Sequence, residues 1–132
     1  DITRVRKMFR DDMASYRAKA EAMRKAEVYR KEYAIAECPS DIESPTVLAA
    51  QTANELLDIS GIKASFVLTV YEGKIYLSAR SIDEVNVQII AEKLGGGGHI
   101  NSAGAQFDHT NIQEVITILK ETIDEMIEEG DI

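Results

Sequence analysis

Two apolar, β-prone runs separated by a tight turn set the strongest constraint on how this chain can fold. The first run covers residues 65–71 and reads SFVLTVY, and the second covers residues 75–79. Glu72, Gly73 and Lys74 lie between them, and a short glycine-containing segment between two such runs predicts a β-hairpin. The chain must therefore form a β-sheet, and its remaining segments have to cover that sheet.

Four other segments carry the signals of helices. Apolar residues recur at steps of three and four over residues 3–26, 83–94 and 111–129. The Ser-Pro pair at residues 44–45 is typical of a helix cap and first turn, and it predicts a helix over residues 45–59. Helices therefore alternate with the strand-type segments along the chain.

Shorter β-prone segments complete the pattern, at residues 28–29, 33–38 and 103–107. Strands that alternate with helices and include a hairpin indicate an α/β fold, a mixed β-sheet flanked by helices, with a long N-terminal connector helix. The helix over 3–26 is the one candidate linker, so the predicted division is a connector over 1–26 and a folded domain over 27–132.

Charge is distributed unevenly between these two parts. Residues 1–31 hold ten of the 15 Lys and Arg residues and five of the 23 Asp and Glu residues, which leaves residues 32–132 strongly acidic. The basic helix is either a packing helix with a solvated face or a connector from an upstream domain, and both can hold. Affinity for long nucleic acids depends on neutralising many phosphates, so long DNA or RNA is not an expected ligand.

Several classes of protein are excluded or disfavoured by simple features of the sequence. No apolar run approaches the ~20 residues that span a bilayer, so no membrane contact by this chain is expected. Cys38 is the single cysteine, which excludes an internal disulfide. A cytoplasmic location is expected. The start at Asp1 without Met indicates a piece of a longer protein. Other segments of that longer protein could anchor it to the membrane.

A run of four glycines is the strongest local signal of a functional site. Gly95, Gly96, Gly97 and Gly98 are followed directly by His99. Glycines let backbone N–H groups approach phosphate oxygens closely, and an imidazole can donate a hydrogen bond to an anionic oxygen. The alternative is a flexible loop followed by a surface histidine. The spacing matches neither a Walker A loop nor a dinucleotide-binding fingerprint.

Two further segments offer polar groups near predicted strand ends. Arg80 and Ser81 follow the second hairpin strand, and a guanidinium suits a phosphate or a base edge, although an ordinary surface ion pair is the alternative. Asn101 opens a small-residue segment that can equally be a plain turn. The sequence contains no recognisable set of catalytic residues. A metal site is also not expected, because His99 and His109 are ten residues apart and have only Asp108 as a carboxylate beside them.

Several of these motifs together resemble one known family. The segments at 77–81 (LSARS), 84–88 (EVNVQ), 95–99 (GGGGH) and 101–106 (NSAGAQ) are similar to the DHH-associated C-terminal domain of DHH phosphoesterases. Within that superfamily they most resemble the bacterial cyclic di-AMP phosphodiesterases of the GdpP type. The opening of the chain resembles that family's connector between its DHH and DHH-associated domains.

The resemblance implies a function that the residues alone do not establish. It implies a phosphodiesterase whose DHH domain, absent from this chain, binds two manganese ions. This chain would then hold no metal ion and no catalytic residue, and it should be inactive alone. Substrate contacts are implied for Arg80, Ser81, Gly95 to Gly98, His99 and Asn101. The implied partners are a cyclic dinucleotide or short nucleotide and the upstream DHH domain, and a homodimer is possible.

Two alternative functions stay open at this point. The chain could be the clamp domain of a DHH exonuclease or short-oligoribonucleotide hydrolase, or a non-catalytic nucleotide-binding module. Its acidic balance disfavours a long polymer but not a substrate of two nucleotides.

Overall fold

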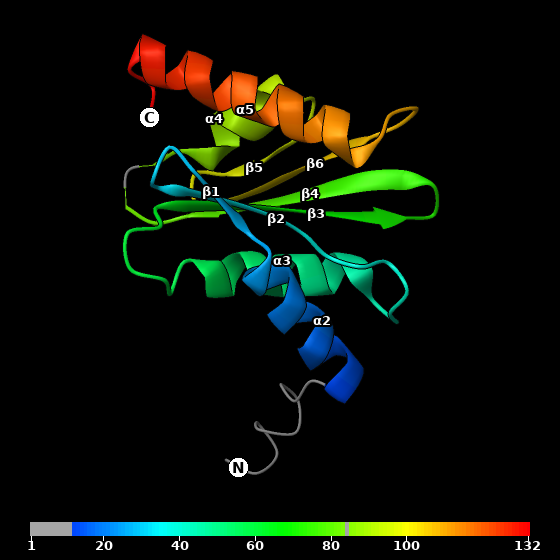
Figure 1. The fold of residues 1–132 in the computed structure, drawn as a ribbon. Helices are drawn as coiled ribbons and strands as arrows, with labels where there is room; N and C mark the ends of the chain where they lie inside the picture. The colour runs from blue at the N-terminus through cyan, green and yellow to red at the C-terminus, as the bar shows by residue number, and fades with distance from the viewer. Residues whose placement is uncertain (1–11, 84) are drawn as a thin grey trace.

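A six-stranded β-sheet lies between two layers of helices in the computed structural model, which describes residues 12–83 and 85–132. The strands are β1 (Glu27–Tyr29), β2 (Tyr33–Glu37), β3 (Ala64–Tyr71), β4 (Lys74–Ser81), β5 (Gly97–His99) and β6 (Ser102–Phe107). Their order across the sheet is β1-β2-β3-β4-β6-β5. The predicted α/β fold is confirmed (Figure 1).

The predicted hairpin forms the centre of the sheet. β3 and β4 pair antiparallel over their full lengths, and Glu72 and Gly73 form the two-residue turn, both with positive φ (51° and 78°). This is the backbone that a tight hairpin requires. β2 and β3 are parallel while the other neighbouring strands are antiparallel, so the sheet is mixed as expected.

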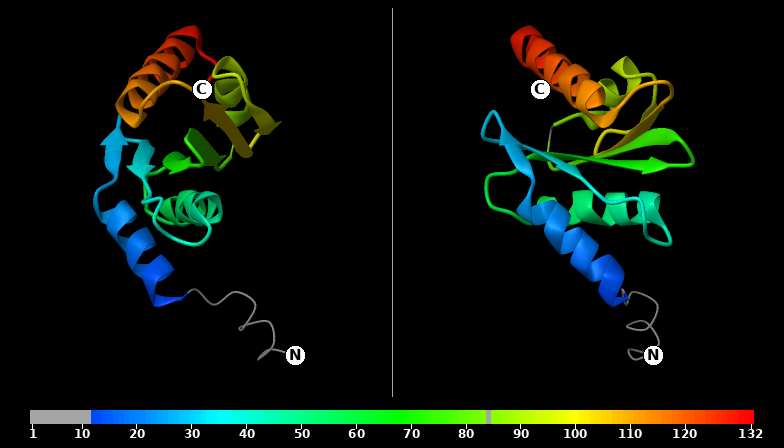
Figure 2. Two further views of the ribbon diagram at one scale, coloured as in Figure 1. Left: turned by 90° about the vertical axis from the view of Figure 1, so that its right-hand side faces the viewer. Right: turned by 45° about the vertical axis from the view of Figure 1, so that its right-hand side comes forward.

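Each face of the sheet is covered by two helices (Figures 1 and 2). On one face lie α4 (Val87–Lys93) and α5 (Ile112–Glu129), which enclose a core around Phe66, Leu68 and Leu77. On the other face lie α2 (Met13–Arg24) and α3 (Pro45–Leu56), which enclose a second core. Figure 2 shows the two layers from the side, with the β6–β5 edge extending beyond α3.

Two predicted helix boundaries are wrong. The connector was expected to be one helix over 3–26, but Asp12 is extended and caps α2 by accepting a hydrogen bond from the Ser15 N–H (2.7 Å), so α2 begins at Met13. The part of that prediction over residues 1–11 lies outside the described residues. No helix among the described residues is long and apolar enough to span a membrane.

The helix expected from Asp83 begins later, at Val87. Asp83 has a positive φ (55°), which a right-handed helix cannot include. Asn86 instead caps α4 by accepting a hydrogen bond from the Ile89 N–H (3.3 Å). Asp83, Val85 and Asn86 therefore lie outside α4, between Ser81 at the end of β4 and the start of the helix.

Candidate functional site

The free part of the sheet on the α3 side presents a row of polar residues. Along β4, Leu77 and Ala79 are buried in the core beneath α4 and α5, so alternation places Ser78 and Arg80 on the opposite face. α3 packs on β3 and β4. The β6–β5 edge extends beyond that helix, which leaves this part of the face uncovered (Figure 2).

Strand register brings three of the polar residues into line. His99 in β5 pairs with Ser102 in β6, and Ser102 pairs with Arg80 in β4. Neighbouring strands are about 4.8 Å apart, so the backbones of His99 and Arg80 are separated by about 10 Å. Arg80, Ser102 and His99 therefore share one face in one row, although 19 positions of sequence separate the first from the last.

The guanidinium of Arg80 is partly buried and forms no ion pair with any described carboxylate. Its Nη1 donates hydrogen bonds to the carbonyl oxygens of Ala79 (2.9 Å) and Ala103 (3.4 Å). Burial lowers the pKa of Arg80, which means that the charged form is incompletely solvated here. An anion on the open face would compensate this charge.

A hollow of about 360 Å³ continues the open face next to this row. Its walls include Thr46 at the start of α3, Tyr76 and Ser78 of β4, and Gly104 and Gln106 of β6. Its volume falls in the range of small-molecule sites. Hydroxyl and amide side chains near Arg80 suit a polar, anionic ligand.

The glycine run does not form the loop that its composition suggested. Gly97, Gly98 and His99 form β5, and the two preceding glycines end α4. The Gly95 N–H donates to the Glu92 carbonyl (3.1 Å) and the Gly96 N–H to the Ala91 carbonyl (2.8 Å), the pattern of a Schellman helix end. These two N–H groups are therefore used inside the protein and are not free to bind phosphate.

Backbone conformation explains one of the four glycines, and steric contacts explain two others. Gly95 has the positive φ (90°) that the helix end needs, a Cβ on Gly96 would lie 2.0 Å from the Gly104 carbonyl oxygen, and a Cβ on Gly98 would lie 2.5 Å from the Ala103 Cα. A Cβ on Gly97 would meet nothing within 4 Å. Gly97 lies two residues before His99 in β5 and therefore faces the same side of the sheet as His99 and Arg80. The described part of the chain gives no reason for a glycine at this position.

Ser81 and Asn101 lie together but serve the loop after β4. Ser81 is 5% exposed, and its hydroxyl donates to the Val85 carbonyl (2.6 Å). The Asn101 Nδ2 donates to the Ser81 Oγ (2.9 Å) and to the Asp83 carbonyl (3.2 Å). Both side chains therefore hold the segment that follows Arg80, on the α4 side of the sheet.

Ser78, Ser102 and Gln106 share the open face with Arg80 but were not among the predicted substrate contacts, although the segments around Ser78 and Ser102 were noted. For Ser78 the signal was available in β4, where the apolar residues Leu77 and Ala79 alternate with the polar residues Ser78 and Arg80. No group of three metal-ligating side chains comes together among residues 12–83 and 85–132. The manganese ions that the resemblance implies do not fit any described part of this chain.

The family is shown by direct comparison. Residues 31–125 match the family described as the DHHA1 domain, and this range contains β3, β4 and the glycine strand. The chain belongs to the DHHA1 family. The predicted resemblance is thereby confirmed.

Two curated relatives match nearly all of this DHHA1 chain. The cyclic-di-AMP phosphodiesterase GdpP of Geobacillus thermodenitrificans is 39% identical over 131 residues, which is 98% of this chain and 20% of the relative. The cyclic-di-AMP phosphodiesterase PdeA of Listeria monocytogenes is 38% identical over 125 residues, which is 94% of this chain and 19% of the relative. The chain thus spans about a fifth of these relatives' length.

A solved structure shares the fold of this DHHA1 chain. An exopolyphosphatase-related protein from Bacteroides fragilis superposes with a TM-score of 0.80 at 19% identity, over 92% of this chain and 37% of that chain. At this identity the likeness shows the fold alone.

Proposed function

We propose that this DHHA1 domain holds the nucleotide substrate of a DHH phosphodiesterase that hydrolyses cyclic di-AMP to a linear dinucleotide. The observation that carries the proposal is the guanidinium of Arg80, which is partly buried on an open face and has carbonyl oxygens but no described carboxylate beside it. An acidic chain with 23 Asp and Glu residues offers many partners for an arginine, so an arginine without a described carboxylate partner supports a place for an outside anion. The names of the relatives supply the substrate.

Each residue of the row has a separate part in this proposal. The Arg80 fork binds a phosphate or a base edge, and His99, which is exposed two strands away, donates to a second anionic oxygen. Gly97 leaves room for the substrate to approach the backbone of β5. Since β5 is an edge strand, some of its N–H groups point away from β6 and can meet the ligand.

Ser81 and Asn101 act as positioning residues rather than contacts. Their hydrogen bonds fix the loop directly after Arg80, so they set where its guanidinium lies. The metal-dependent step belongs, in this proposal, to a DHH domain upstream in the same protein. This chain supplies binding and orientation, and by itself should not hydrolyse a phosphodiester.

The test is kinetic and uses the full-length protein. Arg80→Ala and His99→Ala should each lower kcat/KM for cyclic di-AMP by about tenfold to a hundredfold, the range for losing a charge-assisted hydrogen bond, roughly 1.4–3 kcal/mol. Arg80→Lys should recover little, because an ammonium cannot reproduce the fork. Neither alanine variant should change the urea midpoint by much, since neither side chain belongs to the core.

A matched control separates this effect from a general loss of charge. Arg24→Ala removes an exposed arginine that pairs with Glu21 on α2, and it should leave kcat/KM within about twofold, since exposed ion pairs contribute little. If Arg80→Ala and His99→Ala behave like this control, the open face does not bind the substrate. A preference for short linear RNA over cyclic di-AMP in a binding assay would favour the oligoribonuclease alternative.

A further inference from the structure

The hollow of about 360 Å³ on the open face differs in character from the row of Arg80 and His99 beside it. Among the described residues that line this hollow, none carries a charge. Its side chains offer an aromatic ring at Tyr76, an amide at Gln106 and hydroxyl groups at Thr46 and Ser78. A neutral, flat group with polar atoms at its edge therefore fits the hollow better than a phosphate does.

Strand register places an aromatic ring and an amide next to each other at one end of the hollow. Tyr76 in β4 pairs with Gln106 in β6, so both side chains leave the sheet on the open face. The Cβ atoms of residues paired in this way are about 4.5–5.5 Å apart. The ring of Tyr76 is held by an edge-to-face contact with Tyr71, with ring centroids 6.2 Å apart and planes inclined by 64°. Tyr76 therefore offers a positioned ring, and bases stack on such rings.

The amide of Gln106 is available to a ligand. Its side chain is exposed and forms no hydrogen bond with any described residue. A glutamine amide offers both an acceptor and donors, and it can bond to the N6 amino group and to N7 of adenine at the same time. Guanine and hypoxanthine carry an oxygen in place of that amino group, so the amide oxygen of Gln106 would lose its donor.

Small residues connect the hollow with Arg80. Ser78 in β4 pairs with Gly104 in β6, and this pair lies between Tyr76 and Arg80 on the same face. Tyr76 and Arg80 are four residues apart in β4, which corresponds to about 13 Å along the strand. One nucleotide can therefore lie along β4 with its phosphate at Arg80, its sugar over Ser78 and Gly104, and its base at Tyr76.

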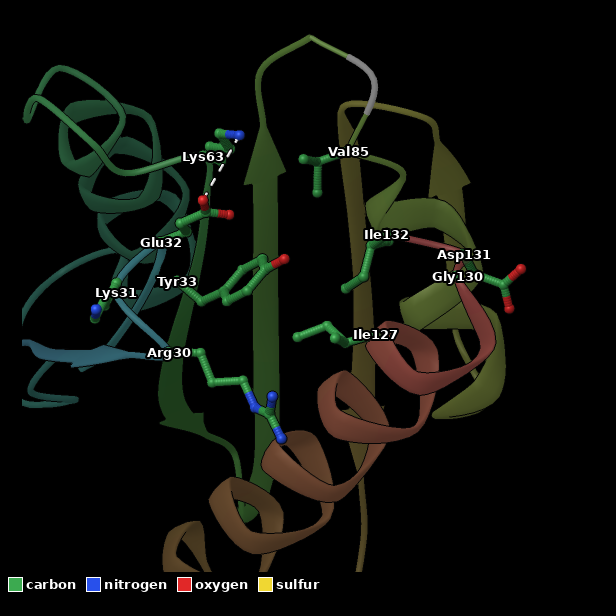
Figure 3. Close-up of a pocket in the computed structure, with 10 residues that line it drawn as sticks. All are labelled: Arg30, Lys31, Glu32, Tyr33, Lys63, Val85, Ile127, Gly130, Asp131 and Ile132. Atoms are coloured by element: carbon green, nitrogen blue, oxygen red, sulfur yellow. Dashed lines mark ion pairs between the residues drawn. The ribbon is translucent and has the colours of Figure 1, made fainter.

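A larger hollow, of about 690 Å³, is less suited to the base. It lies on the α5 side of the sheet, and Arg80 faces the other side. Its lining contains charges of both signs, and Lys63 and Glu32 form an ion pair there (3.7 Å; Figure 3). A nucleotide with its phosphate at Arg80 cannot reach this hollow, because the sheet separates the two.

We propose that Tyr76 and Gln106 select adenine as the base of the substrate. Tyr76 stacks on the base, and Gln106 accepts a hydrogen bond from the N6 amino group and donates one to N7. This assignment rests on the proposed function, in which the open face binds a cyclic dinucleotide. Arg80 holds the phosphate, which is the same whichever base is attached, so it contributes affinity and not base selectivity.

The test measures base selectivity in the full-length protein. It compares kcat/KM for cyclic di-AMP with kcat/KM for cyclic di-IMP, in which an oxygen replaces the N6 amino group. Gln106→Ala should lower the ratio of the two values about tenfold, within the range for one bidentate contact to a base. Tyr76→Leu should lower both values about tenfold and leave the ratio unchanged, because stacking does not depend on the base. Tyr76→Phe keeps the ring, so both values should stay within about twofold of the wild type.

Two control variants separate this assignment from the proposed function. Gln113→Ala changes an exposed glutamine of α5 on the other side of the sheet and should leave both values unchanged. Arg80→Ala should lower both values alike. If it does so while Gln106→Ala keeps the wild-type ratio, the proposed function stands and the base assignment is overturned.

The base assignment is equally overturned if Tyr76→Leu retains wild-type kcat/KM, or if Tyr76→Phe loses as much as Tyr76→Leu. A change of the ratio in Arg80→Ala but not in Gln106→Ala would place the base at Arg80 and overturn it as well. If neither Arg80→Ala nor Gln106→Ala has any effect, the proposed function fails and the base assignment fails with it.

Discussion

The packing of the glycine run can be tested by comparing two single methyl groups. Gly96→Ala places a Cβ 2.0 Å from the Gly104 carbonyl oxygen and 2.7 Å from the Ala105 Cα. Both are backbone atoms of β6 and cannot swing away as a side chain would. Gly97→Ala, one residue later, places its Cβ in open space. The two variants are matched in chemistry and differ in what the methyl group meets.

The expected difference in stability follows from these contacts. Overpacking costs about 1–3 kcal/mol, and the contact at Gly96 involves backbone, so the upper part of this range applies. The cost is limited because β5, which forms three residue pairs with β6, can separate from it. Replacing glycine by alanine also stiffens the unfolded chain, which stabilises either variant by about 0.4–1 kcal/mol. Gly96→Ala should therefore be about 2 kcal/mol less stable than Gly97→Ala.

Urea unfolding of the 132-residue chain, followed by circular dichroism, measures this difference. With a slope of about 2 kcal/mol per molar for a small domain, the two midpoints should differ by about 1 M. The same two variants in the full-length protein should separate stability from function. Gly97→Ala should be at least as stable as the wild type and should still lower kcat/KM for cyclic di-AMP. Equal midpoints for the two variants would refute the packing of β5 on β6, and with it the argument that Gly97 is open for a ligand.

Two other interactions give measurable predictions. Asn101→Ala removes the hydrogen bond to Ser81 (2.9 Å) and should lower the free energy of unfolding by about 1–2 kcal/mol in urea, and an unchanged midpoint would contradict its positioning role. Hydrogen bonds from Tyr29 and then Arg30 lower the pKa of Asp124. The carboxylate therefore stabilises the fold above its ordinary pKa, and this contribution is lost as pH falls through the lowered one. The stability advantage over Asp124→Asn should shrink below about pH 4, and an advantage that does not depend on pH would contradict this assignment.

Elements with strong local signals were predictable from the sequence. The β3–β4 hairpin has two apolar runs and a turn that accepts positive φ, and α5 has apolar spacing, an Asn111 cap and Gly130 at its end. The start of α4 was missed because the helical pattern continues upstream of Asn86, while the backbone at Asp83 does not. The cap residue Asn86 sets the start of α4, and the spacing of apolar residues does not reveal a cap.

The strand formed by Gly97, Gly98 and His99 could not be predicted from local preference. Glycine is disfavoured in strands, so four in a row indicate a loop. The pairing of β5 depends on β6, whose backbone comes so close that Gly96 and Gly98 cannot carry a side chain. That contact joins residues that are neighbours only after the sheet has formed, and no single segment of the sequence contains it.

The composition of the site follows from strand alternation more than from motif wording. The segment Ser78-Ala79-Arg80-Ser81 looks like one unit, but β4 sends Ser78 and Arg80 to the open face and Ser81 to the side of α4. In β6 the same rule separates Ser102 and Gln106 from Ala103, which is in the core. A ligand on the open face can therefore meet Arg80 but not the Ser81 hydroxyl, although they are adjacent in sequence. Residues of one motif have two roles here, and the register of the sheet decides which role each takes.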